Sequence, residues 1–330
     1  MKIPSTLVCP NHQTPLHFSA EKTGEGMALL CQGNCRFPIR GGFPWFAEPD
    51  AFASAFGRHW QRFRSIRYDS TTGTGFALAK LERILGAPIE TLKNRTILEA
   101  GCMTGRYTEI LLDSGAQVHA FDLSEAVNAN YANHAHNRRF FGFQADLTSL
   151  PFKPENFDAV VSLGVVHHTK NPEKTLAALV RNLKPDGLLL FDHYGPDYHV
   201  PVARDLLRRF LRLLPVHAGS WLGLMIIRIL SLLHMPFWHN GWGATRLRHA
   251  LGHISPVIDL YETHGSVGKK LLRRWCILET HDCITDIYKQ TRTPEQLRRA
   301  LETFGLVVEH MNKVGYLIEV RAVKSSPALD

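Results

Sequence analysis

The stretch Ile97–Leu111, ILEAGCMTGRYTEIL, constrains the fold of this 330-residue chain more than any other. Its apolar start predicts a buried strand, and RYTEILLDSG predicts an amphipathic helix that ends at Gly115. Gly101 and Gly105 lie in the loop between them, where glycine lets backbone N–H groups approach a ligand closely. This order of strand, loop and helix is typical of a mononucleotide-binding βαβ unit.

Two carboxylates flank this loop. The next predicted strand, AQVHAFDLS, ends in Asp122, 21 residues after Gly101, where an acid accepts hydrogen bonds from ribose hydroxyls. Glu99 ends the first strand, where a carboxylate repels pyrophosphate but suits the ammonium group of an amino acid. Near the C-terminus, LVVEHMNKVGYLIEVRAVK predicts two strands joined too tightly for a helical crossover, hence an antiparallel hairpin. A purely parallel dinucleotide-binding fold does not end in this way.

The N-terminal region carries two short pairs of metal-binding side chains, CPNH at Cys9–His12 and CQGNC at Cys31–Cys35. Zinc takes four nitrogen or sulfur ligands in a tetrahedron, and two such pairs about twenty residues apart can supply them. We therefore predict a structural zinc site at Cys9, His12, Cys31 and Cys35, with His17 as a substitute ligand. The alternative is that the cysteines are ordinary buried thiols.

The net charge and the first residues of the chain indicate its compartment and the chemical class of its partners. The chain has a net charge of +8 and six cysteines, and MKIPSTLVCPNH lacks the apolar run of a signal peptide. We therefore expect a cytoplasmic protein in which cysteines bind metal or stay free rather than form disulfides. The excess of positive charge is compatible with nucleic acid, anionic lipid or an acidic substrate.

Residues 199–255 form an arginine-rich apolar segment. Seven arginines and one acid, Asp205, give it a net charge of 7 − 1 = +6. Helical spacing places Leu207, Phe210, Leu211 and Leu214 on one face and Arg204, Arg208 and Arg212 on another. The apolar run WLGLMIIRILSLLHMPFW is short for a membrane span and is interrupted by Arg228 and His234, so no transmembrane helix is predicted. Either the helices form a lid over the substrate pocket, or they lie peripherally on a membrane surface.

Several motifs together resemble the class I S-adenosylmethionine-dependent methyltransferases. LEAGCMTGRY is like their first glycine motif, VHAFDLS like their ribose-binding acid, and FQADLTSLPF places Asp146 like the residue that binds the adenine amino group. FDAVVSLGVVHHTKNP and LVRNLKPDGLLLFDHYG are similar to their fourth strand with its exit loop and to the helix, turn and fifth strand that follow. The resemblance implies an α/β fold with a Rossmann-like seven-stranded sheet, an antiparallel last hairpin, and S-adenosyl-L-methionine as cofactor.

The resemblance extends beyond the core. The N-terminal pairs followed by RFPIRGGFPWF look like the zinc-ribbon-like domain fused to some of these enzymes, and the late THDCITDIYKQTRTPEQLRRALETFGL looks like their substrate-covering region. The expected organisation is a zinc-ribbon-like domain (1–46), a helical linker (47–93), the cofactor-binding core (94–198), the basic helical insert (199–255), and substrate-covering helices with the final hairpin (256–330). In the linker, Arg64, Tyr68 and Thr72 are candidates to close over the cofactor.

Met103 departs from the family pattern, which has glycine at this place. A positive φ at methionine costs about 1–2 kcal/mol, which corresponds to roughly a tenfold loss of affinity. We expect the loop to remain competent. Leu147 and Phe143 are candidate apolar walls for the adenine ring. The residues expected to bind the cofactor are Glu99, Gly101, Cys102, Met103, Gly105, Asp122, Leu123, Asp146, Leu147 and Leu163.

Methyl transfer needs a base only if the acceptor must lose a proton. Candidates follow the fourth and fifth strands, because open α/β sheets bind ligands at the carboxyl ends of their strands. We name His168, His193 and Tyr194 as candidate catalytic residues, and we assign His167 to packing. In the late region His281, Asp282 and Tyr288 are candidates for contact with substrate or for hydrogen bonds within the scaffold.

The sequence therefore predicts a methyltransferase that acts on a small or lipid-like acceptor. An RNA base methyltransferase, such as an rRNA enzyme, is the first alternative, since the chain is basic. Against it, the basic segment pairs arginine with leucine rather than with aromatic residues for base stacking. The second alternative is a non-catalytic binding protein that kept the fold after Met103 weakened the cofactor loop.

Overall fold

The computed structural model describes residues 3–19, 26–49, 66–198 and 200–326, together with Ala53, Ser54, Gly57 and Trp60. The chain divides into two compact units. The first comprises Met1–Pro49, Ala77–Tyr198 and Tyr288–Asp330, and the second comprises Asp50–Phe76 and His199–Ile287. Each unit is described by itself.

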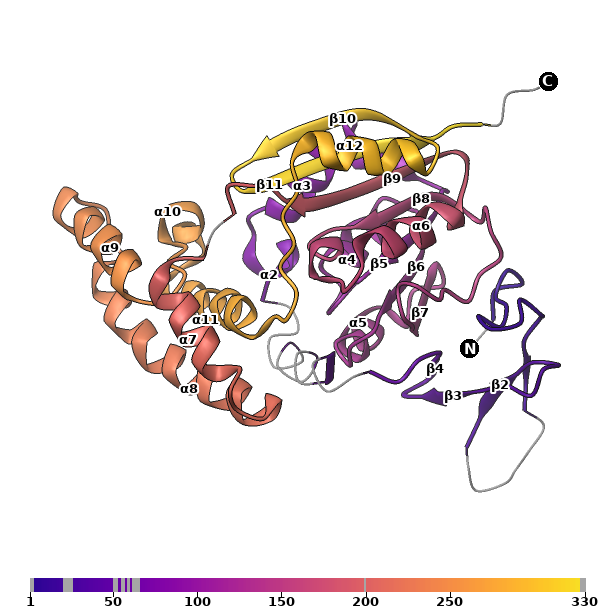
Figure 1. The fold of residues 1–330 in the computed structure, drawn as a ribbon, viewed down its shortest axis with the longest axis horizontal. Coiled ribbons are helices and arrows are strands. Elements are labelled where there is room, and N and C mark those ends of the chain that lie inside the picture. Colours follow the sequence, from indigo (N-terminus) through magenta and orange to yellow (C-terminus); the bar gives the residue numbers. More distant parts are fainter. Residues whose placement is uncertain are drawn as a thin grey trace. The chain divides into compact units, whose positions relative to one another are not determined.

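A seven-stranded sheet forms the centre of the first unit, in the order β10-β11-β9-β8-β5-β6-β7 (Figure 1). Its strands β5 to β9 are parallel to their neighbours, whereas β11 pairs antiparallel with both β9 and β10. The predicted seven-stranded sheet with an antiparallel last hairpin is confirmed. The strands are β5 (Thr96–Ala100), β6 (Gln117–Asp122), β7 (Phe140–Gln144), β8 (Phe157–Ser162), β9 (Leu183–Tyr194), β10 (Leu306–Val314) and β11 (Leu317–Lys324).

Helices cover both faces of this sheet, which explains why its parallel strands are mostly apolar. Local sequence sets several helix starts. Asn171 accepts a hydrogen bond from the backbone N–H of Lys174, and Thr293 forms a capping box with Gln296. The helices are α3 (Phe76–Leu85), α4 (Arg106–Asp113), α5 (Val127–His134), α6 (Pro172–Asn182) and α12 (Pro294–Thr303).

A small four-stranded antiparallel sheet precedes the main one. It contains β1 (His17–Phe18), β2 (Ala28–Leu30), β3 (Arg36–Arg40) and β4 (Phe43–Pro44) in that order. The chain then joins the edge of the main sheet, where the N–H of Phe46 donates to the carbonyl of Gln144 at 2.8 Å. This small sheet carries the cysteine–histidine pairs, and all six cysteines of the chain are free thiols.

The second unit is helical, with α2 (Asp69–Thr72), α7 (Val202–Leu211), α8 (Val216–His234), α9 (Trp242–Ile254), α10 (Tyr261–His264) and α11 (Lys269–Thr285). Gly219 and Gly223 let α8 approach its neighbours closely. A Cβ at Gly219 would lie 2.6 Å from the carbonyl oxygen of Leu211, and one at Gly223 would lie 2.9 Å from the Leu211 side chain. The segment Val216–Phe237 is long and apolar enough to cross a membrane, judged by length and composition over the described chain, and 28% of it is buried.

Helix α7 does not place its side chains as its apolar spacing suggests. Phe210 is 51% exposed, while Leu211 is buried. Arg204 and Arg208 are turned inward and donate to the carbonyl oxygens of Pro256 and Asp286. These half-buried guanidinium groups are tolerated here because backbone carbonyls accept hydrogen bonds from them.

Candidate functional site

The loop Gly101–Gly105 joins β5 to α4 in a backbone conformation that favours glycine. Gly101 has a φ of +78°, and a Cβ there would lie 2.4 Å from the Val165 side chain. Gly105 has a φ of 100° and caps α4. The N–H groups of Gly101 and Cys102 both donate to the carbonyl of Phe121 at 2.9 Å, which fixes the loop to the end of β6.

Met103 adopts the left-handed conformation that its neighbours in the loop take, with a φ of 50°. The loop therefore keeps its course despite the methionine, at a cost in backbone strain. Its N–H donates to Asp122 Oδ2 at 2.9 Å, so the residue also ties the loop to β6.

Replacing Met103 with glycine is expected to raise the free energy of unfolding by about 0.5–1 kcal/mol, because relief of the positive φ outweighs the added freedom of the unfolded chain. Valine at the same place should lower it, since β-branched residues fit this conformation worst. Urea unfolding of both variants measures the effect. Equal stability of M103G and M103V would contradict a left-handed residue here.

Asp122 ends β6 with both carboxylate oxygens already engaged. Oδ1 accepts from the N–H and the hydroxyl of Ser124 at 2.8 and 2.7 Å, and Oδ2 accepts from Met103. A carboxylate offers about four lone-pair positions, so about one remains for a ligand hydroxyl. Burial raises the pKa of Asp122, and the Ser124 and Met103 donors oppose this rise. Asp122 thus both holds the loop and faces the place where the sequence predicts a ribose.

Glu99 is 3% exposed and points toward α4. It accepts a short hydrogen bond from the hydroxyl of Thr108, which in turn accepts from Asn130 Nδ2 at 2.8 Å. Burial raises the pKa of Glu99 from 4.5 to about 8, and the negative charge of Asp122 adds to the effect. Thr108 and Asn130 were not predicted as site residues, because only the folded chain brings α4 and α5 beside this carboxyl.

The end of β7 holds the predicted adenine-binding residues. Asp146 Oδ1 accepts from the N–H and the hydroxyl of Thr148 at 2.7 and 2.6 Å. Leu123 and Leu147 are half-buried, as a residue that lines a cleft would be. Phe143 is fully buried and stacks on Phe121 with ring centroids 5.0 Å apart, so the prediction that it walls the adenine ring is wrong. It belongs to the core under the site.

The exit loop of β8 is held by an ion pair that the sequence did not suggest. Gly164, which follows the buried Leu163, donates its N–H to Asp192 Oδ1 at 2.6 Å. Asp192 Oδ2 lies 2.6 Å from Lys80 Nζ. Although burial opposes its charge, Asp192 keeps the pKa of Lys80 above its ordinary value. Asp192 lies within the apolar strand sequence GLLLFDHY. Because a buried carboxylate needs a partner, this position could have predicted an ion pair.

The candidate catalytic residues form one cluster at the ends of β8 and β9. Nδ1 of His168 lies 3.0 Å from the carbonyl oxygen of Tyr288, and its Nε2 lies 3.3 Å from the hydroxyl of Tyr194. A carbonyl only accepts, so Nδ1 carries the proton and Nε2 is left as an acceptor. His193 is buried, with its Nδ1 3.0 Å from the carbonyl oxygen of Tyr194, and its Nε2 has no hydrogen-bond partner among the described residues.

His167 is a packing residue in this cluster. Its ring is buried, and its centroid lies 3.8 Å from that of Tyr194. Burial keeps the pKa of His167 well below its usual range, and burial likewise lowers that of His193. Both rings are therefore neutral at physiological pH. Tyr194 also stacks on Tyr198 at a centroid distance of 3.8 Å, so an aromatic wall surrounds the His168–Tyr194 pair.

Other predicted residues lie outside this cluster. Arg64 falls outside the described residues, and Tyr68 and Thr72 belong to the second unit. His281 and Asp282 also lie there and bond within it. His281 Nε2 lies 3.0 Å from the carbonyl oxygen of Ser220, and Asp282 accepts from Trp60 Nε1 at 3.1 Å. Tyr288 contributes its backbone carbonyl, which orients His168.

The N-terminal cysteine and histidine side chains meet as predicted. The ligand atoms of Cys9, His12, Cys31 and Cys35 all lie within 4.8 Å of one another. Nδ1 of His12 is 3.7, 3.4 and 3.5 Å from the sulfurs of Cys9, Cys31 and Cys35. Tetrahedral zinc with its usual bond lengths needs about 3.5 Å between nitrogen and sulfur ligands. His17 is exposed on β1 and is not part of this cluster.

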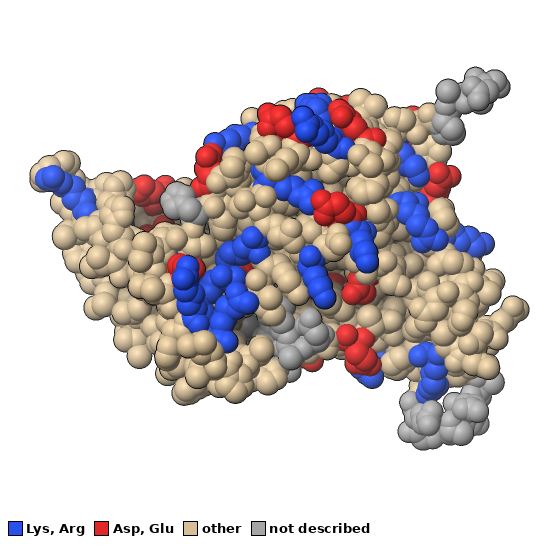
Figure 2. Space-filling model, viewed as in Figure 1, with Lys and Arg blue, Asp and Glu red and all other residues tan. Residues whose placement is uncertain are grey.

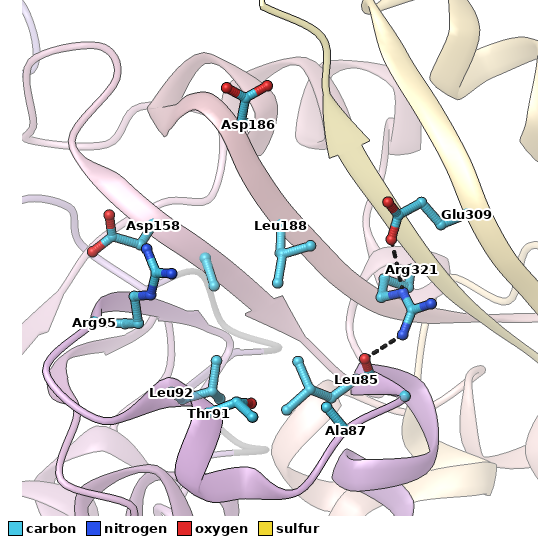
Figure 3. A pocket seen from close by; sticks show the side chains of 12 residues that line it. Leu85, Ala87, Thr91, Leu92, Arg95, Asp158, Asp186, Leu188, Glu309 and Arg321 are labelled. Atoms are coloured by element: carbon cyan, nitrogen blue, oxygen red, sulfur yellow. Dashed lines mark hydrogen bonds and ion pairs between the residues drawn. The ribbon is translucent and has the colours of Figure 1, made fainter.

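A cavity of about 390 Å³ lies near the amino ends of the parallel strands, whereas the predicted site residues lie at their carboxyl ends (Figure 3). Its lining includes Arg95, which directly precedes β5, and Asp158, which is the second residue of β8. Three of its charged groups are already paired: Arg321 contacts Glu309 at 3.1 Å, and Asp158 contacts Lys184 at 2.8 Å. None of the predicted site residues lines this cavity.

Comparisons with known proteins find similarity within the segment from β5 to β9. Residues 98–191 match the family model described as "Methyltransferase domain". A malonyl-[acyl-carrier protein] O-methyltransferase of Paenibacillus sp. (strain JDR-2) is 31% identical over 108 residues, which cover 31% of this chain and 39% of that protein. A ubiquinone biosynthesis O-methyltransferase of Coxiella burnetii (strain Dugway 5J108-111) is 29% identical over 103 residues, covering 31% of this chain and 44% of that protein.

The chain thus spans about two fifths of the length of the curated relatives it matches. Among solved structures, the 1,6-didemethyltoxoflavin-N1-methyltransferase of Burkholderia thailandensis aligns with a TM-score of 0.45 at 15% identity, covering 94% of this chain and 99% of that one. The strand order and the matched segment carry the assignment. Residues 98–191 of this chain match a methyltransferase domain, and they lie within the predicted Rossmann-like seven-stranded sheet.

Proposed function

We propose that the protein transfers a methyl group from S-adenosylmethionine to a small or lipid-like acceptor. The observation that supports this most is the junction of β5, α4 and β6. Three left-handed residues, Gly101, Met103 and Gly105, turn the chain there, and Asp122 is bonded directly to the turn. Such a junction presents a carboxylate and a close backbone to the same nucleoside.

The residues at this edge of the sheet fit the cofactor. Asp122 would bind the ribose, Asp146 and the half-buried Leu147 the adenine, and Glu99 would lie near the ammonium group. A Cβ at Gly164 would meet nothing within 4 Å, so the backbone of the β8 exit loop is open to a ligand. The bound cofactor supplies an electrophilic methyl group, and the chain orients the acceptor toward it and excludes water.

His168 is proposed as the base that takes a proton from the acceptor. Its Nδ1–H is held by the carbonyl of Tyr288, which makes Nε2 the acceptor nitrogen of the ring. Tyr194 lies beside that nitrogen and would position the acceptor or relay its proton. An acceptor hydroxyl needs such a base, in keeping with the O-methyltransferase names of the two relatives.

A small or lipid-like acceptor accounts for the arginines better than RNA does. Arg204, Arg208 and Arg248 donate to carbonyl oxygens inside the second unit, at 2.7 to 3.0 Å. A guanidinium held in this way is not available to a phosphate. The exposed remainder of the basic segment lies among exposed apolar side chains, most of them aliphatic, although Arg246 lies over the Trp242 ring at 4.4 Å.

We also propose that zinc occupies the Cys9–His12–Cys31–Cys35 cluster and stabilises the small sheet. Replacing Cys31 with serine is expected to abolish stoichiometric zinc and to lower the free energy of unfolding of the small sheet by several kcal/mol, since metal binding there contributes directly to folding. Zinc content by atomic absorption and amide exchange of β2 and β3 measure the two effects. His17→Ala is the matched control. Full zinc content in C31S would contradict this ligand set.

Affinity for the cofactor product should depend on pH through Glu99. Because the pKa of Glu99 is raised to about 8, the free protein holds this carboxyl mostly protonated at pH 7. An ammonium group favours the ionised form, so affinity for S-adenosylhomocysteine should rise roughly tenfold per pH unit up to that pKa and then level off. Adenosine, which lacks the ammonium, should show no such rise. Calorimetry from pH 6 to 9 tests this, and a rise retained in E99Q would contradict the assignment to Glu99.

Thermal unfolding with nucleotides tests the proposed function itself. S-adenosylhomocysteine at about a hundred times its dissociation constant should stabilise the protein by about 2.7 kcal/mol, whereas NAD should give no shift. A shift with NAD and none with S-adenosylhomocysteine would contradict the proposal. Methyl transfer is then followed by incubating labelled S-adenosylmethionine with a total lipid extract.

A further inference from the structure

The helical unit exposes an unusual amount of apolar surface. Of the eighteen large apolar side chains that are exposed in the described chain, thirteen lie between Val202 and Ile254. On α7 they are Val202, Leu206 and Phe210, spaced so that they share one face of the helix, and Leu213 follows in the turn after it. Soluble surfaces rarely gather so many such side chains, and a gathering of this kind marks a binding surface.

Helix α8 continues this surface. Trp221, Met225, Ile229 and Leu232 are exposed and recur every three or four residues, and Trp221 is 63% accessible. The opposite side of α8 is buried through Gly219, Gly223 and Ile227 against α7 and α11. The apolar residues of α8 are therefore sorted onto a protein-facing side and a solvent-facing side.

Positive charges dominate this part of the chain. Residues 202–254 carry seven arginines and a single acid, Asp205, which is paired with Arg209 at 2.7 Å. Three of the arginines are turned inward, and Arg209, Arg212, Arg228 and Arg246 remain exposed. Figure 2 shows this part of the molecule as mostly uncharged surface with scattered basic groups. Apolar side chains bordered by arginine complement an anionic lipid surface.

The inner side of α8 rules against a helix that spans the bilayer. His234 contacts Asp259 Oδ2 at 3.1 Å and Ser255 Oγ at 3.0 Å, and Trp238 donates to the same aspartate at 3.0 Å. Helix α11, packed against α8, begins with Lys269 and Lys270 and contains Asp282. Withdrawing α8 into lipid would break this polar network and leave its buried groups unpaired.

We propose that the exposed face of α7 and α8 binds the surface of an anionic membrane, with α8 lying in the plane of the headgroups. The occupant is lipid rather than protein because the face combines exposed tryptophan, long aliphatic side chains and flanking arginines without exposed acids on these helices. This inference does not depend on the methyltransferase activity. It adds a location at which a lipid-like acceptor would be met.

Flotation of the full chain with vesicles tests the proposal. The protein should float with vesicles of phosphatidylcholine and phosphatidylglycerol, and less with phosphatidylcholine alone. The double variant Trp221→Gln/Ile229→Gln should lower the bound fraction by at least about tenfold, since the binding scales with buried apolar area. The pair Arg212→Gln/Arg228→Gln should weaken binding to the anionic vesicles alone.

Matched controls lie in the first unit. Val307→Gln removes an exposed apolar side chain from β10, and Arg138→Gln/Arg139→Gln removes two exposed charges. Neither should change flotation. No flotation of the wild type with anionic vesicles would overturn the proposal, and so would equal flotation of the W221Q/I229Q variant. Resistance to alkaline carbonate extraction would instead indicate a span, and a dimer that W221Q/I229Q converts to a monomer would assign the face to a second copy of the chain.

Discussion

Replacing His168 with alanine is expected to lower the rate of methyl transfer by about 100- to 10,000-fold, the usual contribution of a positioned base. The expectation rests on the orientation of the ring. The carbonyl of Tyr288 fixes the proton on Nδ1, so Nε2 is an acceptor within 3.3 Å of the Tyr194 hydroxyl. The rate is measured as S-adenosylhomocysteine formed from S-adenosylmethionine in the presence of a total lipid extract.

The control variants separate chemistry from folding. Tyr194→Phe keeps the ring stack on Tyr198 and should lower the rate less than H168A, while His136→Ala removes an exposed histidine and should change nothing. Affinity for S-adenosylhomocysteine should stay within about twofold in H168A, and added imidazole should restore part of its rate. A rate close to that of the wild type would show that no base is needed at this position.

Replacing Asp122 with alanine should weaken binding of S-adenosylhomocysteine by about a hundredfold. A hydrogen bond to a charged group contributes about 1.5–3 kcal/mol, and about one acceptor position of Asp122 remains for a ribose hydroxyl. The substitution also removes the acceptor for the Met103 N–H, so the loop loses its link to β6. Both losses act on the same ligand, which makes this effect large.

Calorimetry with S-adenosylhomocysteine measures the loss. Asp122→Asn keeps one acceptor oxygen and should fall between the wild type and D122A. Asp113→Asn, at an exposed position at the end of α4, is the matched control for removing a carboxylate. An affinity of D122A within twofold of the wild type would mean that the nucleoside binds elsewhere.

Features with a local sequence signal were predicted well. The segment Ile97–Leu111 contains its own strand, turn and helix signals, and the structure confirms β5 and α4 there. The tight connection near Gly315 likewise required antiparallel strands, and β10 and β11 pair in that way. The spacing of the cysteine pairs was sufficient to predict that four ligand atoms would meet.

Features that depend on distant partners were not predicted. Nothing near Lys80 in the sequence indicates that it will meet Asp192, 112 residues away. Glu99 was predicted from its position at a strand end, but its direction depends on Thr108 and Asn130. Phe143 was assigned to the ligand because β7 ends beside the site, whereas the strand turns its ring into the core.

The helical unit shows the same limit. Helical spacing separates the apolar and basic sides of α7 but does not say which side is buried. The structure turns Arg204 and Arg208 inward, where backbone carbonyls outside their own helix satisfy them, and leaves Phe210 exposed. These acceptors come from residues 256 and 286, so the arrangement is a property of the folded unit.

Determining the structure of the full chain with S-adenosylhomocysteine bound tests the central claim most directly. We predict a ribose hydroxyl on Asp122, the adenine between Asp146 and Leu147, and the amino acid part over the Gly101–Gly105 turn toward Gly164. A nucleoside in the cavity lined by Arg95 and Asp158 near the amino ends of the parallel strands, or one whose ribose does not contact Asp122, would contradict this prediction.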